Sequence, residues 1–305
     1  MTRPADRALR LADDLSVGRL GYGAMQLPGP GIWGPPRDHD TALAVLRRAV
    51  ALGVTHIDTS DFYGPHVAND LIREALHPYP GDLVIATKVG AARDERHGFE
   101  AAAEPRQLRD QVEGNLARLG RDRLDLVYLR LGGDGLLPPG EVPFTESFGA
   151  LADLRQRGLI RNLGLSGVTT TQLALAREIA PVAAVQNRFH LFDRSSADVL
   201  SACEAAGIAF AAYFPLAAGM LRPGLDLSRV PPGMAPSAGQ LAALDEIAGR
   251  YRATRAQVAL SWLLGHCPVT LAIPGTSSPA HLEENMAAAG LRLSAEDQTV
   301  LDKLA

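Results

Sequence analysis

The chain has 305 residues, of which 47% are hydrophobic and 21% charged, so it contains ample apolar material for a core. Its formal net charge of −4 gives no electrostatic basis for binding nucleic acid or an anionic membrane surface. The first residues lack the apolar run of a signal peptide, and no apolar stretch is long enough to cross a membrane. We therefore expect a cytoplasmic protein whose partner is a small molecule.

Apolar segments recur along nearly the whole chain, each followed by a longer amphipathic segment. Apolar residues fill these short segments without alternation, which is typical of parallel strands buried on both faces. The expected strands are Arg19–Gln26, Val54–Asp58, Leu83–Thr87, Leu124–Leu129, Ile160–Leu165, Ala183–Gln186, Ile208–Tyr213 and Thr270–Ile273.

The segments between these strands have the apolar periodicity of helices. Several end in a glycine that fits the left-handed position after a helix, namely Gly53, Gly158 and Gly207. The expected helices are Asp40–Leu52, Val67–Leu76, Pro105–Leu119, Phe144–Arg157, Thr169–Ile179, Ser195–Ala206 and Pro279–Ala289.

About eight strand–helix units, with no GxGxxG motif after the first strand, predict an α/β fold of the closed (β/α)₈ TIM-barrel type. Leu131–Pro143 and Leu216–Gly239 are rich in Gly and Pro and predict long loops at the C-terminal face, where barrel active sites are built. An extra helix, roughly Ala253–Leu264, precedes the eighth strand. No linker interrupts the pattern, so we interpret residues 1–305 as a single domain, with 1–17 as a flexible N-terminal extension.

The two cysteines, Cys203 and Cys267, lie far apart and have no companion histidine cluster. This arrangement predicts neither a disulfide framework nor a metal site. We expect both thiols to be buried as small hydrophobic groups.

Polar residues follow two neighbouring strands of the predicted barrel. Asp58 ends the second strand, Tyr63 lies on the loop after it, and Lys88 ends the third strand. Neighbouring strand ends converge on one face of a barrel, so these three side chains can meet. A cation beside a phenol lowers its pKa from about 10, which suits the phenol to donate a proton to a carbonyl oxygen. The alternative is a structural Asp58–Lys88 pair at the barrel rim, with Tyr63 covering it.

The motifs "HIDTSDFYG", "ATK", "GLS" (164–166), "VQN" (185–187) and "IPGTSSPAHLEEN" (273–285) resemble the aldo-keto reductase superfamily, in order along the chain. The phrases "RLGYGAMQLPGPGIWGPPRD" and "HIDTSDFYGPH" are more similar still to its bacterial pyridoxal reductase (pyridoxine 4-dehydrogenase) branch. The resemblance implies a (β/α)₈ barrel, NADP(H) as cofactor and direct hydride transfer to an aldehyde or ketone.

The resemblance assigns catalytic roles to Asp58, Tyr63 and Lys88, and most members carry a histidine as the fourth residue. Here Arg130 stands at that position. A guanidinium is a permanent cation with fixed donors, so Arg130 can bond the carbonyl oxygen and acidify Tyr63 but cannot relay a proton. The alternative role of Arg130 is an ion pair that anchors its loop, with Asp134 as the partner.

The resemblance also implies a cofactor site. Ser166 and Gln186 bond the nicotinamide carboxamide, Tyr213 stacks on the nicotinamide ring, and the backbone of Leu216–Gly219 approaches the pyrophosphate. The family's asparagine after this serine is Gly167 here, and the usual small residue after the tyrosine is Phe214.

The adenosine end of the cofactor is expected at the helix that begins at Pro279, because helix N-terminal amides suit an anion. Many relatives place Lys or Arg here to bind the 2′-phosphate, and this chain offers His281. We therefore expect NADP(H) rather than NAD(H) as the cofactor, although His281 binds a phosphate less strongly than Lys or Arg would. The remaining residues expected at this end are Gly275, Thr276, Ser277, Glu284 and Asn285.

Trp33, Phe62 and His66 are candidates for the wall of the substrate pocket, and Phe189, His190 and Phe192 are further ones. The alternative for the aromatic side chains is ordinary packing, and for His66 a solvated loop position. Trp262 on the extra helix is expected in the core.

The leading functional interpretation is an NADPH-dependent reductase of a small polar aldehyde, with pyridoxal as the first candidate. A second is a tailoring reductase for a ketone of a sugar or a natural product. A third is a nicotinamide-sensing binding subunit without catalysis, which the retained Asp58, Tyr63 and Lys88 disfavour. A fourth is redox-neutral chemistry in which hydride is taken and returned.

Overall fold

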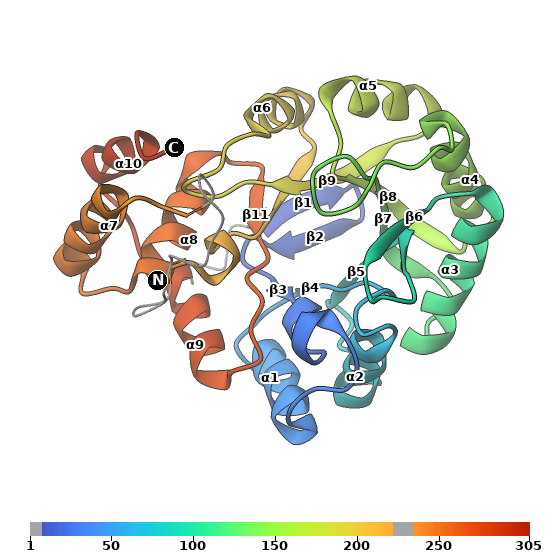
Figure 1. The fold of residues 1–305 in the computed structure, drawn as a ribbon, viewed down its shortest axis with the longest axis horizontal. Coiled ribbons are helices and arrows are strands. Elements are labelled where there is room, and N and C mark those ends of the chain that lie inside the picture. The colour runs from blue at the N-terminus through green and yellow to red at the C-terminus, as the bar shows by residue number, and fades with distance from the viewer. Residues whose placement is uncertain (1–7, 222–234) are drawn as a thin grey trace.

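The structure, a computed structural model, describes residues 8–221 and 235–305. Its barrel strands run parallel in the order β11–β10–β9–β8–β7–β5–β4–β3, and helices surround them (Figure 1). This arrangement is the predicted (β/α)₈ barrel. The barrel strands are β3 (Tyr22–Gly23), β4 (His56–Asp58), β5 (Val84–Arg93), β7 (Leu124–Arg130), β8 (Ile160–Ser166), β9 (Val182–Arg188), β10 (Ala209–Tyr213) and β11 (Thr270–Ala272).

Each predicted strand has a counterpart, but the first is much shorter than expected. β3 ends at Gly23, and the 3₁₀ helix η2 (Ala24–Gln26) follows it directly. The sheet closes here, because the backbone N–H of Gly23 donates to the carbonyl of Pro274 at 3.2 Å. A Cβ on Gly23 or Gly275 would lie 2.6 or 2.7 Å from a backbone oxygen across this junction, so the close approach requires glycine at both positions.

The helices are α1 (His39–Ala51), α2 (Val67–Leu76), α3 (Pro105–Leu119), α4 (Phe144–Gln156), α5 (Thr170–Ile179), α6 (Ala197–Ala206), α7 (Ala238–Tyr251), α8 (Arg255–His266), α9 (Pro279–Ala287) and α10 (Ala295–Asp302). Short 3₁₀ helices occur at η3 (Pro30–Ile32), η4 (Ala217–Gly219) and η6 (Ala288–Gly290). Gly53, Gly158 and Gly207 have φ of 87°, 83° and 66°, which confirms their predicted left-handed positions after α1, α4 and α6.

Two helices and one strand after the first barrel strand were not predicted from the sequence. α8 corresponds to the expected extra helix, but α7 precedes it and α10 follows α9. The unpredicted strand is β6 (Phe99–Ala102), which pairs antiparallel with the end of β5. Most of the predicted loop Leu216–Gly239 lies outside the described residues.

The N-terminal segment differs from the flexible extension expected for residues 1–17. β1 (Ala8–Ala12) and β2 (Leu15–Gly18) form an antiparallel hairpin. Leu11, Leu15 and Val17 are buried in the cluster that contains Val84 and other residues of the barrel interior. The hairpin therefore closes the N-terminal end of the barrel and leaves its C-terminal end for a site. Residues 1–7 lie outside the described part.

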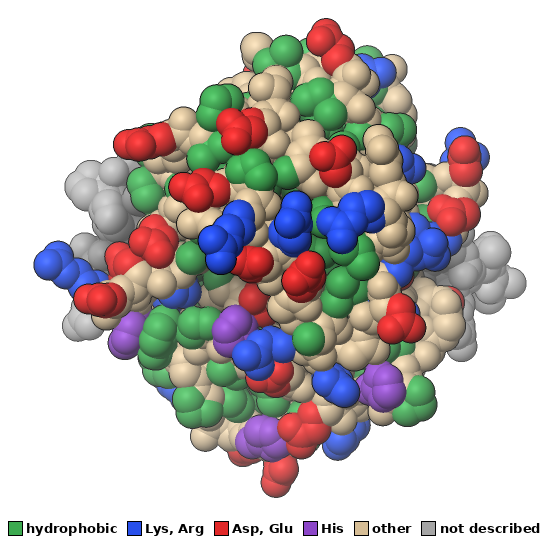
Figure 2. All heavy atoms as spheres, turned by 90° about the vertical axis from the view of Figure 1, so that its right-hand side faces the viewer, with side chains coloured by type: hydrophobic (Ala, Val, Ile, Leu, Met, Phe, Trp, Pro, Cys, Tyr) green, Lys and Arg blue, Asp and Glu red, His purple; other side chains and the backbone are tan. Residues whose placement is uncertain are grey.

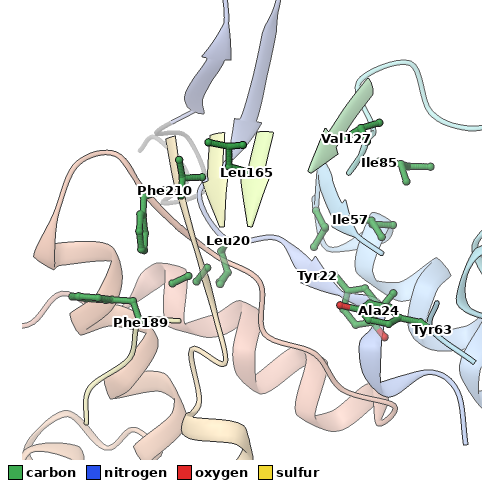
Figure 3. Close-up of a cluster of buried hydrophobic side chains, with 14 of the residues drawn as sticks. Leu20, Tyr22, Ala24, Ile57, Tyr63, Ile85, Val127, Leu165, Phe189 and Phe210 are labelled. Atoms are coloured by element: carbon green, nitrogen blue, oxygen red, sulfur yellow. The ribbon is translucent and has the colours of Figure 1, made fainter. Parts of the chain in front are cut away.

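The main core lies between the strands and the helices, and Figure 3 shows part of it. Phe189 packs edge-on against Phe210 and stacks on Trp262, with ring centroids 5.9 and 6.0 Å apart. Trp262 is fully buried, as predicted. Both cysteines are free and buried, which confirms their expected role as small hydrophobic groups.

The outer surface has the character of solvated helix faces. Figure 2 shows acidic and basic side chains interspersed on the face that carries α3 and α4. Among the described residues, no helix combines the length and apolarity needed to cross a membrane.

Candidate active site

Asp58 and Lys88 form a buried ion pair at the C-terminal mouth of the barrel. Nζ of Lys88 lies 2.5 Å from Oδ1 of Asp58 and also donates to the carbonyl of Thr59 at 2.9 Å. Both side chains are only 4% exposed. Burial lowers the pKa of Lys88, but Asp58 and Tyr63 outweigh it and raise that pKa overall. Lys88 is therefore a fixed ammonium group.

Tyr63 lies beside this pair, with Nζ of Lys88 5.0 Å from the centroid of its ring. Its side chain is buried and belongs to the hydrophobic cluster drawn in Figure 3. Burial raises the pKa of Tyr63 above its ordinary value, against the opposing effects of Lys88 and Arg130. The sequence-based expectation of a lowered pKa is therefore wrong. A phenol with a raised pKa stays protonated at neutral pH, and the nearby cations stabilise the phenolate that forms once it donates its proton.

Arg130, the last residue of β7, is held on one side by Asp134. Its Nη2 lies 2.6 Å from Oδ2 of Asp134, which is the ion pair anticipated as the alternative role. Arg130 also lines the cavity described below. Its Nη1 is buried and has no hydrogen-bond partner within residues 8–221 and 235–305.

The Arg130 guanidinium lies directly against Gly167. A Cβ at position 167 would stand 2.0 Å from Nη1 of Arg130, and Gly167 has a left-handed φ of 71°. The positive φ favours glycine here, and an added Cβ would also lie 2.9 Å from the carbonyl oxygen of Leu131. The Arg130 guanidinium therefore occupies the space that a side chain at position 167 would fill.

Gln186 contacts the ion pair directly, since its Nε2 donates to Oδ2 of Asp58 at 2.7 Å. Ser166 lies between Arg130 and Gln186 in the strand register. On β10, the Tyr213 hydroxyl donates to Oδ2 of Asp134 at 2.8 Å. The predicted carboxamide ligands and the predicted stacking tyrosine thus surround the catalytic candidates at one end of the barrel.

A cavity of about 470 Å³ opens at this end of the barrel. Ile32, Phe99, Leu136 and Leu137 give it an apolar wall. The predicted site residues that line it are Asp58, Phe62, Tyr63, Lys88, Arg130, Ser166, Gln186, Tyr213, Leu216, Gly219, Gly275, Thr276, His281, Glu284 and Asn285.

Trp33, His66 and Ser277 were also predicted at the site, but they are not among the residues that line this cavity. Trp33 stacks on His97, with ring centroids 3.7 Å apart. His66 pairs with Asp61 at 2.8 Å. Phe189, His190 and Phe192 are likewise outside the lining. The structure therefore does not place Trp33 or His66 at the substrate wall.

The lining fits an extended nicotinamide dinucleotide. The cavity lining includes the Ser166 hydroxyl, the Gln186 amide, the Tyr213 ring and residues Leu216, Ala218 and Gly219. His281, in the first turn of α9, lines it as well, and the side chain of Ser278 caps the N-terminus of this helix. Hydrogen-bonding groups, an aromatic face, small residues and a helix N-terminus suit the amide, ring and phosphate groups of such a cofactor.

Two positioning contacts at the site were not foreseen. Asp134 was considered only as a partner of Arg130, yet it also binds Tyr213, and its place four residues after Arg130 is the only sequence signal for either contact. The Tyr22 hydroxyl, fully buried, donates to the carbonyl of Thr276 at 2.6 Å and so fixes the segment before α9. No sequence pattern indicates this contact between residues so far apart in the chain.

We compared the chain with known protein families, curated proteins and solved structures. The aldo/keto reductase family model matches residues 19–305. The chain is 49% identical over 288 residues to pyridoxine 4-dehydrogenase of Escherichia coli, with 94% of each chain covered. Among solved structures, it is similar to a glycerol dehydrogenase from Gluconobacter oxydans (27% identity, TM-score 0.85, 98% and 95% covered). It is also similar to an aldo-keto reductase from Klebsiella pneumoniae in complex with NADPH (26% identity, TM-score 0.76, 100% and 95% covered).

Proposed function

Because the chain belongs to the aldo/keto reductase family and is an NADPH-dependent carbonyl reductase, we propose that it reduces the aldehyde of pyridoxal to the alcohol of pyridoxine. The similarity to pyridoxine 4-dehydrogenase over 94% of the chain supports this substrate. The cavity wall of Ile32, Phe99, Leu136 and Leu137 suits a flat aromatic ring, and Arg130 suits its polar substituents. We further propose that the protein acts in the cytoplasm and that its barrel is a single domain.

The observation that carries the proposal is the buried Asp58–Lys88 pair directly beside Tyr63. NADPH, when bound, supplies the hydride that adds to the carbonyl carbon. Tyr63 donates its hydroxyl proton to the carbonyl oxygen, and solvent later returns a proton to the phenolate. Lys88 stabilises that phenolate, and Asp58 holds Lys88 in place.

In this proposal Arg130 donates a hydrogen bond to the carbonyl oxygen, at the place where most family members have a histidine. The nicotinamide end of the cofactor binds at Ser166, Gln186 and Tyr213. The phosphates lie along Leu216–Gly219 and the N-terminus of α9, where His281, Glu284 and Asn285 contact the adenosine end.

The test is NADPH oxidation by the purified protein with pyridoxal, compared with an aliphatic ketone, a keto sugar and a simple benzaldehyde. We expect the highest kcat/KM with pyridoxal, and pyridoxine as the product identified by chromatography. A kcat/KM for pyridoxal no better than that for the keto sugar would contradict the proposed substrate and favour the tailoring-reductase alternative.

A further inference from the structure

The carboxylate of Asp134, in the segment between β7 and α4, accepts hydrogen bonds from three parts of the molecule. Oδ2 accepts from Nη2 of Arg130 at 2.6 Å and from the Tyr213 hydroxyl at 2.8 Å. Oδ1 accepts from the backbone N–H groups of Leu136 at 3.1 Å and Leu137 at 3.4 Å. One side chain therefore joins the end of β7, the end of β10 and the turn that follows Asp134.

These groups come from different elements that line the same cavity. β8 and β9 separate β7 from β10 in the sheet, so backbone pairing does not connect Arg130 with Tyr213. Arg130, Tyr213, Leu136 and Leu137 all line the cavity. Asp134 is thus a bridge between the wall expected to contact the nicotinamide and the apolar wall expected to contact the substrate.

The charges favour a strong bridge. Burial raises the pKa of Asp134, but Arg130 and the hydrogen bonds lower it overall, so the carboxylate is ionised. Burial raises the pKa of Tyr213, so its hydroxyl remains a donor. Hydrogen bonds to an ionised acceptor are shorter and stronger than those between neutral groups. A change in the position of the Tyr213 ring is therefore transmitted to Asp134.

We propose that Asp134 is a positioning residue that couples cofactor binding at Tyr213 to ordering of the turn Asp134–Leu137 at the substrate wall. The proposal rests on the proposed function, in which the nicotinamide stacks on Tyr213. Stacking restricts the Tyr213 ring, its hydroxyl restricts the carboxylate, and the carboxylate restricts the amides of Leu136 and Leu137. Bound cofactor thereby preorganises the wall on which the carbonyl substrate packs, and by linkage substrate tightens cofactor binding by the same factor.

The test is amide hydrogen exchange of residues 131–143 in the full-length protein, with and without saturating NADPH. In the wild-type protein we expect NADPH to slow exchange in this segment about fivefold or more. Tyr213→Phe keeps the aromatic ring for stacking but removes the hydroxyl, so NADPH should still bind while its effect on exchange disappears. Asp134→Asn should give the same loss, because an amide has one acceptor oxygen: it can accept from Arg130 and Tyr213 or from the N–H groups of Leu136 and Leu137, but not from both sides.

The matched control is Asp14→Asn, which removes an ion pair with Arg161 remote from the cavity. This variant should keep the full effect of NADPH on exchange. A purely structural role of Asp134 would increase exchange equally with and without NADPH. That result, an effect of NADPH that persists in Tyr213→Phe, or no effect in wild-type protein that binds NADPH would each overturn the proposal.

The exchange experiment needs no carbonyl substrate, so it is independent of the pyridoxal assay. Failure to reduce pyridoxal would contradict the proposed substrate and leave the coupling intact. Conversely, normal pyridoxal turnover with no effect of NADPH on exchange would contradict the coupling alone.

Discussion

The hydroxyl of Tyr63 is the proposed proton donor, and its environment keeps it protonated until a carbonyl oxygen arrives. Tyr63→Phe removes this donor while it retains the ring packed against Phe62. We expect kcat to fall by about 10²–10⁴-fold, the usual contribution of general acid catalysis, with the Kd for NADPH nearly unchanged. Steady-state kinetics and NADPH titration measure both quantities. A variant with near wild-type kcat would exclude Tyr63 as the acid.

Arg130 has two possible roles, and pH–rate curves separate them. If it acts on the substrate oxygen and on Tyr63, Arg130→Met removes a charge that lowers the pKa of Tyr63. The alkaline limb of the pH profile for reduction should then move upward, and kcat/KM should fall. Arg130→His should recover part of the rate if position matters more than charge. If Arg130 only anchors Asp134, the Met variant should lose thermal stability and keep an unshifted alkaline limb with normal kcat/KM.

A substitution at Gly167 tests whether activity depends on the position of the Arg130 guanidinium. Gly167→Ala puts a methyl group 2.0 Å from Nη1 of Arg130, so the guanidinium must move. We expect kcat/KM to fall toward that of Arg130→Met, together with a loss of about 1 kcal/mol from the left-handed backbone. Gly158→Ala is the matched control, since Gly158 has a φ of 83° and no atom within 4 Å of an added Cβ. It should lose about 1 kcal/mol from the left-handed backbone alone and keep its activity, whereas the alanine at position 167 also meets the Leu131 carbonyl oxygen at 2.9 Å and should lose more. If the two variants have equal activity, the space at position 167 does not control how Arg130 acts in catalysis.

At the scale of elements, α9 carries the expected contact with the cofactor 2′-phosphate. His281 lies in the first turn of this helix and lines the cavity. If the His281 side chain binds the 2′-phosphate there, His281→Ala should weaken NADPH binding and hardly change NADH binding. His281→Arg should tighten NADPH binding, because a guanidinium is a permanent cation that can bind a phosphate through two N–H groups. An unchanged NADPH affinity in His281→Ala would exclude His281 from this role.

The buried barrel strands were predictable because both of their faces are covered, so their sequences are continuous apolar runs. The hairpin β1–β2 was missed, although Leu11, Leu15 and Val17 alternate with exposed residues as in a half-buried strand, because its strands are too short for the pattern to stand out among the charged residues of this segment. α7 follows a segment rich in Gly and Pro, which hid its start at Ala238.

Some features of the site were predictable from the sequence, and others were not. Motif order was enough to bring Asp58, Tyr63 and Lys88 together, since strand ends in a barrel converge. The sign of the Tyr63 pKa shift was not predictable, because it depends on how deeply packing buries the ring. The contact of Arg130 with Gly167 depends on backbone approach between two strands, and no local pattern records it.

At the scale of the whole molecule, two buried histidines link folding to pH. His56, on β4 inside the barrel, is fully buried, and neither ring nitrogen has a hydrogen-bond partner among the described residues. Burial lowers its pKa to about 4. His190 is 6% exposed, and burial lowers its pKa to about 4 as well. Both rings are therefore neutral in the folded protein at pH values where an unfolded chain carries them protonated.

The direction in which pH changes the free energy of unfolding follows from proton uptake by the two histidines. Below the unfolded pKa of about 6.5 the unfolded state binds more protons, so the free energy of unfolding falls as pH decreases toward 4. Each histidine contributes about 3 kcal/mol over this window, and the two together give a slope approaching about 3 kcal/mol per pH unit near pH 5. Urea unfolding followed by tryptophan fluorescence at pH 4.5–7.5 measures the slope. His56→Gln should reduce it by about half, because one proton fewer is taken up on unfolding. A free energy of unfolding that stays level from pH 6.5 to 4.5 would mean that these rings take up protons in the folded protein, and it would contradict their lowered pKa values.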